Sequence, residues 1–108
     1  MTTAELSVVP RRTENESVLE LTGEIDLSTT DQLRSAVEEA LAATPAQPIV
    51  LDFSGVTFCD SQGLSTLLAL SRRATAAGTT LALVNVGDFL VRLLDITGLR
   101  SALSVRDA

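Results

Sequence analysis

The chain has 108 residues, which suits one compact domain, and its net charge is −6. All eight cations are arginines, and they form no cluster larger than the pairs Arg11-Arg12 and Arg72-Arg73. Because phosphate contacts need clustered cations and anionic lipid headgroups repel an acidic surface, these features argue against direct nucleic-acid and membrane partners. No apolar run approaches the roughly 20 residues that a membrane helix needs.

The N-terminal region predicts a hairpin at a sheet edge. Residues 1–4 are expected to be flexible, and they lack the basic start and apolar stretch of a signal peptide, so we expect a cytoplasmic protein. Residues 6–9 predict a short strand. In residues 17–22, Leu19 and Leu21 alternate with Glu20 and Thr22, which predicts a strand with one wet face. The two strands would pair antiparallel through a polar turn over 11–16.

The middle of the chain alternates between helix and strand patterns. Apolar residues at helical spacing predict a helix over 29–43, with its inward residues at Leu33, Ala36, Val37, Ala40 and Leu41. The run Ile49-Val50-Leu51 predicts a central strand covered on both faces, followed by a loop over 54–59. A second helix is predicted over 61–77, with its inward stripe at Leu64, Leu67, Leu68 and Ser71.

The C-terminal third continues this alternation. Residues 80–84 predict another buried strand, residues 88–97 a third helix, and residues 104–106 a short edge strand or helix. Strands that alternate with helices indicate an α/β domain whose central strands are parallel. We therefore predict one domain over 1–108, with a mixed sheet of four to five strands that starts in the N-terminal hairpin.

Missing residue types exclude most catalytic chemistry. Histidine and lysine are absent and Cys59 is the one cysteine, so the chain has no Ser-His-Asp triad, no phosphate-binding loop with lysine, and no plausible zinc site. Cys59 is expected to be a small core residue. Glu24 and Asp26 are interpreted as solvated turn residues, not as an acid–base pair. We predict a protein that is not an enzyme and has no cofactor or metal.

The positive signal lies around Ser61. Gly63 falls in the first turn of the predicted second helix, where glycine costs about 1 kcal/mol relative to alanine. Gly63 either opens the backbone near Ser61 to another molecule or relieves crowding against the preceding loop. The sequence spacing does not distinguish these two explanations. Ser61 or Asp60 could cap the helix, while a phosphate on Ser61 would lie where the helix dipole favours anions. If the central strands are parallel, Asp26, Ser61 and the Gly87-Asp88 loop lie at one end of the sheet.

Three motifs together resemble one known family. Residues 51–56 (Leu-Asp-Phe-Ser-Gly-Val) and 59–64 (Cys-Asp-Ser-Gln-Gly-Leu) resemble the signature of STAS-domain anti-sigma factor antagonists. Residues 21–26 resemble the second-strand motif of that family, and residues 81–86 and 91–99 resemble its next strand and helix. The resemblance covers the chain from about Leu6 to Val105.

The resemblance implies a partner switch. The unphosphorylated protein would bind a serine-kinase anti-sigma factor and release a sigma factor. Phosphorylation of Ser61 by that kinase would end binding, and a serine phosphatase would restore it. The matching positions imply a partner-binding set of Asp26, Asp60, Gln62, Gly63 and Leu64.

Gln62 departs from the family pattern, because many relatives carry a small or hydroxyl residue after the serine. It supports an alternative, a non-phosphorylated STAS scaffold in a stress-signalling or lipid-transport assembly. A third possibility, a nucleotide-binding or hydrolytic enzyme, is opposed by the absence of lysine and histidine. The free protein is expected to be a monomer, although an unpaired edge strand could pair with a second copy.

Overall fold

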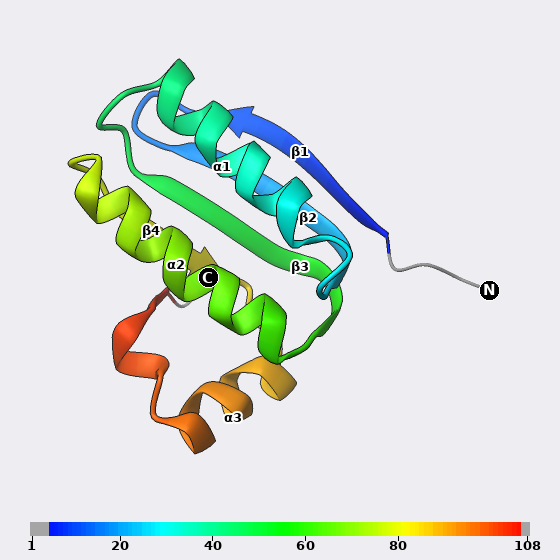
Figure 1. Cartoon of the computed structure of the whole chain (residues 1–108). Helices are drawn as coiled ribbons and strands as arrows, with labels where there is room; N and C mark the ends of the chain where they lie inside the picture. Colours follow the sequence, from blue (N-terminus) through cyan, green and yellow to red (C-terminus); the bar gives the residue numbers. More distant parts are fainter. Residues whose placement is uncertain (1–4, 107–108) are drawn as a thin grey trace.

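A computed structural model describes residues 5–106 and shows a five-stranded sheet against which helices pack (Figure 1). The expected flexibility of residues 1–4 lies outside the described residues. The strands are β1 (Leu6–Arg12), β2 (Ser17–Ile25), β3 (Ile49–Cys59), β4 (Leu81–Val84) and β5 (Ser104–Arg106). The helices are α1 (Thr30–Ala43), α2 (Ser61–Ala76) and α3 (Asp88–Thr97), with a short 3₁₀ turn, η1, over Arg100–Ala102.

The sheet order follows the chain order, β1-β2-β3-β4-β5. β1 pairs antiparallel with β2, and every later pair is parallel, so the predicted mixed sheet and edge hairpin are confirmed. Residues 104–106, predicted as a short strand or helix, form the strand β5 at the edge of the sheet opposite β1. Among residues 5–106, no helix combines the length and the apolar character that crossing a membrane requires.

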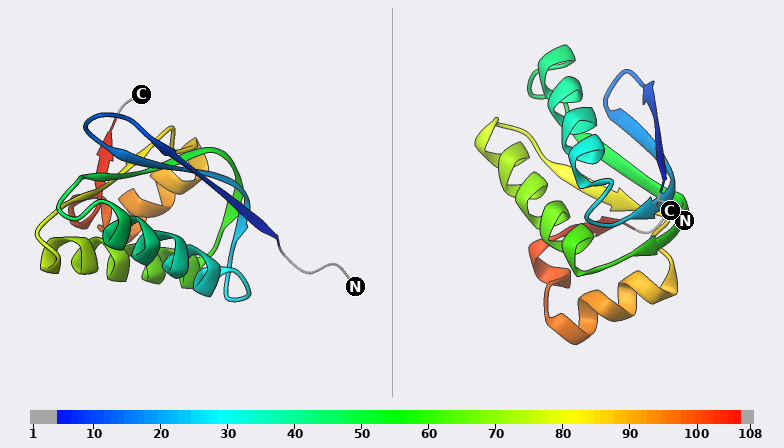
Figure 2. Two further views of the ribbon diagram at one scale, coloured as in Figure 1. Left: turned by 90° about the horizontal axis from the view of Figure 1, so that it is seen from above. Right: turned by 45° about the vertical axis from the view of Figure 1, so that its right-hand side comes forward.

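α1 and α2 lie side by side in one layer against the sheet, and α3 lies outside this layer (Figure 2). The predicted inward residues of α1 are confirmed at Leu33, Val37 and Leu41, while its alanines are only partly buried. In α2 the prediction was partly wrong. Leu70 and Ala74 complete the buried stripe, whereas Ser71 is only partly buried, because α2 packs against both the sheet and α1.

β3 differs most from the prediction. The expected loop over 54–59 is strand, because β3 continues for 11 residues to Cys59. The pairing offset between β2 and β3 grows from 32 at Glu20–Asp52 to 34 at Ile25–Cys59, which means that β3 carries two extra residues in β-bulges. Hydrophobic alternation breaks at bulges, so the sequence pattern there looks like a loop.

Two glycines lie at the bulges between β2 and β3. Gly23 and Gly55 lie inside β2 and β3, near the register shifts. A side chain at Gly55 would bring its Cβ to 2.9 Å from the Leu21 carbonyl oxygen. Since that contact is with backbone, relieving it would require the two strands to move apart.

Asp52 links β3 to the loop that follows β4. Its Oδ1 accepts hydrogen bonds from the Ser54 backbone N–H at 2.9 Å and from Asn85 Nδ2 at 3.0 Å. Burial by itself raises the pKa of Asp52, but the hydrogen bonds from Asn85 and Ser54 outweigh it and hold the pKa below 3.8. Asn85 adopts a left-handed backbone with φ of 56°. The amide therefore fixes the segment that leads into α3.

We predict that Asn85→Gly raises the pKa of Asp52, because glycine keeps the left-handed backbone but removes the amide donor. Carboxyl-detected NMR titration of the folded protein measures this pKa. A depressed pKa in the folded state stabilises the protein above pH 3.8, and this stabilisation is lost as the pH falls. The variant should thus lose less stability on acidification than the parent.

Ser65→Ala is the control, because Ser65 is exposed on α2 and makes no contact with Asp52 among the hydrogen bonds of residues 5–106. An unchanged Asp52 titration in Asn85→Gly would show that the amide does not hold the carboxylate.

Candidate functional site

The ends of β2 and β3 meet at the start of α2. Ile25 pairs with Cys59, and the Asp60 N–H donates to the Ile25 carbonyl oxygen at 3.2 Å. Asp26 and Ser61 follow directly, so the structure brings them together with Asp60 at the carboxyl edge of the parallel strands. This confirms the expected placement, since functional groups of open α/β sheets gather at that edge. The loop at Gly87-Asp88 follows β4 at the same edge.

Ser61 is exposed at the first position of α2, and the preceding residue, Asp60, is the one that caps the helix. The Gly63 N–H donates to Asp60 Oδ1 at 2.9 Å, which makes Asp60 the N-cap. Since Asp60 supplies the cap, helix capping does not explain a serine at position 61. Its hydroxyl lies on the surface, where a second protein can reach it.

Gly63 permits a close contact between α2 and β2. A Cβ at this position would lie 2.7 Å from Ile25 Cγ2, 2.8 Å from Cys59 Sγ and 2.9 Å from the Ile25 carbonyl oxygen. This favours the crowding explanation, although the crowding comes mainly from β2. Gly63 and Leu64 are both buried, whereas Gln62 is exposed beside Ser61. Any role of Gly63 and Leu64 in partner binding is therefore indirect, through the exposed residues beside them, Ser61 and Gln62.

Asp26 shapes the loop between β2 and α1. Its Oδ1 accepts hydrogen bonds from the Ser28 backbone N–H at 2.8 Å and from Ser28 Oγ at 2.7 Å. Thr29, the residue before α1, does not cap the helix with its side chain: its Oγ1 accepts from the Asp26 N–H and donates to the Glu24 carbonyl oxygen. Glu24 lies within β2, so the predicted pair of solvated turn carboxylates was wrong for Glu24.

Cys59 is a core residue, as predicted. It is 3% exposed, and burial followed by the charge of Asp60 raises the pKa of the thiol to about 12. The thiol thus stays protonated and unreactive near neutral pH. Within residues 5–106, no group of three or more histidine, cysteine or acidic side chains lies close enough to hold a metal ion.

Acidic and apolar side chains dominate the surface around Ser61. The loops after β2, β3 and β4, with the first turns of the helices that follow, hold four carboxylates and no arginine: Asp26, Asp31, Asp60 and Asp88. Three large hydrophobic side chains at the same edge are exposed: Leu27, Phe58 and Phe89. The sequence interpretation missed these three, because the exposure of a large apolar side chain depends on tertiary packing and residues 54–59 were expected to form a loop.

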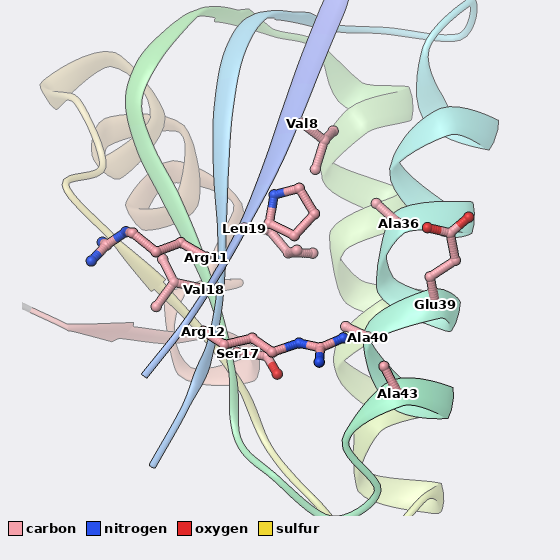
Figure 3. A pocket seen from close by; sticks show the side chains of 11 residues that line it. Val8, Arg11, Arg12, Ser17, Val18, Leu19, Ala36, Glu39, Ala40 and Ala43 are labelled. Carbon is pink, nitrogen blue, oxygen red and sulfur yellow. The ribbon is translucent and has the colours of Figure 1, made fainter. Parts of the chain in front are cut away.

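A hollow of about 280 Å³ lies away from Ser61, between β1 and α1 (Figure 3). Its walls are mainly apolar, from Val8 and Pro10 on the strand and from Ala36 and Ala40 on the helix, and Arg12 extends toward α1. None of the predicted site residues lines it. The hollow therefore supports no role in the chemistry at Ser61.

The family profile described as Mlab, STAS domain, matches residues 8–105. The chain belongs to the STAS-domain family. An anti-sigma F factor antagonist of Paenibacillus polymyxa is 31% identical over 90 residues, which cover 83% of this chain and 77% of the relative. An anti-sigma-B factor antagonist of Bacillus subtilis (strain 168) is 27% identical over 100 residues, covering 93% and 90%.

A solved structure confirms the fold of this STAS domain. The crystal structure of an anti-sigma factor antagonist from Mycobacterium paratuberculosis superimposes with a TM-score of 0.80 at 28% identity, covering 94% of this chain and 85% of that one. The predicted resemblance to anti-sigma factor antagonists is thereby confirmed.

We predict that Gly63→Ala destabilises this STAS domain by about 1–3 kcal/mol, because the added methyl group would overlap the buried side chains of Ile25 and Cys59 and the Ile25 carbonyl oxygen. Helix propensity alone would favour alanine by about 1 kcal/mol, so the sign of the change shows which effect is larger. Urea unfolding followed by circular dichroism measures it. Ser65→Ala, on the exposed side of the same helix, is the control and should change stability little. A stabilised Gly63→Ala variant would contradict the close packing of α2 against β2.

Proposed function

We propose that this STAS domain is an anti-sigma factor antagonist that phosphorylation of Ser61 switches off. The observation that carries the proposal is an exposed hydroxyl at the start of α2, next to an aspartate that already caps the helix. The similarity to antagonists of anti-sigma F and anti-sigma-B factors supports the general role. The unphosphorylated form would bind a serine-kinase anti-sigma factor, and a sigma factor would then be released.

In this proposal the chain is the substrate of the kinase, because it supplies the nucleophile and no catalytic base. Ser61 Oγ would attack the γ-phosphorus of ATP, the bond to the β-phosphate oxygen would break, and ADP would leave. The proton of the hydroxyl would pass to a base of the kinase. A serine phosphatase would later hydrolyse the phosphoserine and restore the hydroxyl.

The folded domain should tolerate the phosphate. The group would add about −1.5 to −2 charge at the N-terminus of α2, where the helix dipole favours an anion. Asp60 and Asp26 oppose it, but Ser61 is exposed and solvent screens the repulsion. The same charge would disfavour a protein complex, because docking removes the solvent from an acidic and apolar surface. The switch would therefore act on binding and leave the fold intact.

Phosphorylation itself can be tested directly. We expect that one of the serine-kinase anti-sigma factors of the source genome, incubated with this protein and ATP, adds one phosphate and that mass spectrometry locates it on Ser61. Ser61→Ala should remain unmodified. Phosphate on Thr57 or Ser65, or none with any of these kinases, would contradict the proposal. Recovery of the native protein in a large scaffold or transport assembly, without a kinase, would instead support the non-phosphorylated STAS scaffold, in which Gln62 obstructs the hydroxyl.

The proposed switch can be tested by adding a negative charge at two different positions of α2. Ser61→Asp should weaken binding to the kinase by roughly tenfold or more, about 1.4 kcal/mol, while the melting temperature moves by less than about 4 °C. Ser65→Asp adds the same charge one turn further along α2 and should bind nearly as the parent does. Calorimetric titration measures the binding affinity, and thermal unfolding measures the melting temperature. An unfolded Ser61→Asp variant would show that the serine is structural.

A further inference from the structure

Two of the three phenylalanines of this chain lie on the surface, although the protein has almost no other aromatic character. Phe53 is 3% exposed, but Phe58 is 43% and Phe89 is 66% exposed. Both exposed rings line one shallow cleft of about 60 Å³ between the end of β3 and the start of α3, together with Val56 and Leu90. Phenylalanine is one of the residue types that are enriched in the cores of protein interfaces.

This cleft adjoins the proposed phosphorylation site. Phe58 is three residues before Ser61, which is at most about 10 Å of extended chain. On the other side, Leu27 is 73% exposed in the loop after β2, and β2 ends at Ile25, whose carbonyl oxygen accepts from the Asp60 N–H. Of five large exposed hydrophobic side chains among the described residues, three therefore lie at the edge of the sheet where α2 begins.

The sizes indicate a protein partner. A cleft of about 60 Å³ is far smaller than the roughly 300–1,000 Å³ of typical small-molecule sites, but it can accept part of one side chain. A standard interface covers about 800 Å² of each partner, and the whole surface of this protein is 6124 Å². An interface of that size around Ser61 extends far enough to include both rings. Any protein that engages Ser61 tightly would thus also cover the aromatic cleft.

The charges argue against a second copy of this chain as that partner. The loops and first helical turns near the cleft and Ser61 hold three carboxylates that form no salt bridge among residues 5–106, so a two-fold dimer through this surface would oppose like charges: Asp26, Asp60 and Asp88. A complementary partner has an apolar side chain for the cleft and cations around it. Two arginines lie on the helices of this edge: Arg34 on α1 pairs with Asp31 at 3.1 Å, and Arg92 on α3 follows Phe89 by three residues.

We infer that Phe58 and Phe89 anchor the serine-kinase anti-sigma factor, which inserts an apolar side chain between them and surrounds the acidic edge with cations. This inference rests on the proposed function. It also accounts for the direction of the switch, because a dianion on Ser61 would enter a contact whose centre is apolar and whose rim on this side is acidic. Without the aromatic anchor, a cationic partner would bind a phosphate more tightly instead of less.

The test compares Phe89→Ala with the parent protein in binding to the kinase that phosphorylates Ser61. Phe89 is the better substitution because its ring is more exposed than Phe58, so its loss should not disturb the fold. We expect affinity to fall by about 30-fold or more, as for an interface hot spot, with an unchanged melting temperature. Val9→Ala is the matched control: Val9 is 53% exposed on β1, away from the α2 start, and should bind as the parent does.

Four outcomes would overturn the inference. Parental affinity of Phe89→Ala, while Ser61→Asp still weakens binding, would remove the aromatic anchor and leave the proposed function standing. Normal kinase binding with slowed dephosphorylation of phosphoserine 61 would assign the cleft to the phosphatase. Sedimentation showing a dimer that Phe89→Ala dissociates would assign it to a second copy. Should no kinase bind the parent protein, the proposed function and this inference both fail.

Discussion

The contact between the end of β2 and the first turn of α2 is the constraint on which the site depends. The Asp60 N–H bonds the Ile25 carbonyl oxygen, and Gly63 lets the helix approach so closely that a Cβ would lie 2.7 Å from Ile25. Because that approach is fixed, Ser61 must lie on the surface beside Asp26. The two bulges in β3 serve the same contact, since they bring Cys59 opposite Ile25.

The buried and exposed sides of this turn have separate tasks. Gly63, Leu64 and Cys59 hold the helix to the sheet from below. Asp60 accepts the hydrogen bond from the Gly63 N–H at the helix N-terminus, so the neighbouring Ser61 hydroxyl is not needed as the cap. A modification of Ser61 can then change what docks on the edge of the sheet without a large effect on the free energy of unfolding. That separation is what a reversible protein switch requires.

The same edge combines two properties that rarely occur together on a free surface. Exposed aromatic rings favour burial against a partner, whereas a concentration of carboxylates opposes burial unless the partner supplies cations. A partner must match both, which restricts the proteins that can bind. The hydroxyl of Ser61 lies among these groups, so a charge added there changes the balance between them.

The sequence by itself determined the order and type of the elements, because helical and alternating periodicities are local; α1, α2 and α3 begin and end within one residue of their predicted limits. It also identified residues 59–64 by their resemblance to the family signature. Only the tertiary structure decided that β3 runs to Cys59, since bulges depend on pairing with β2, and that Asp60 is the cap of α2. It alone placed Phe58 and Phe89 at one cleft, because residues 31 positions apart in the sequence meet only when β3 and α3 pack together.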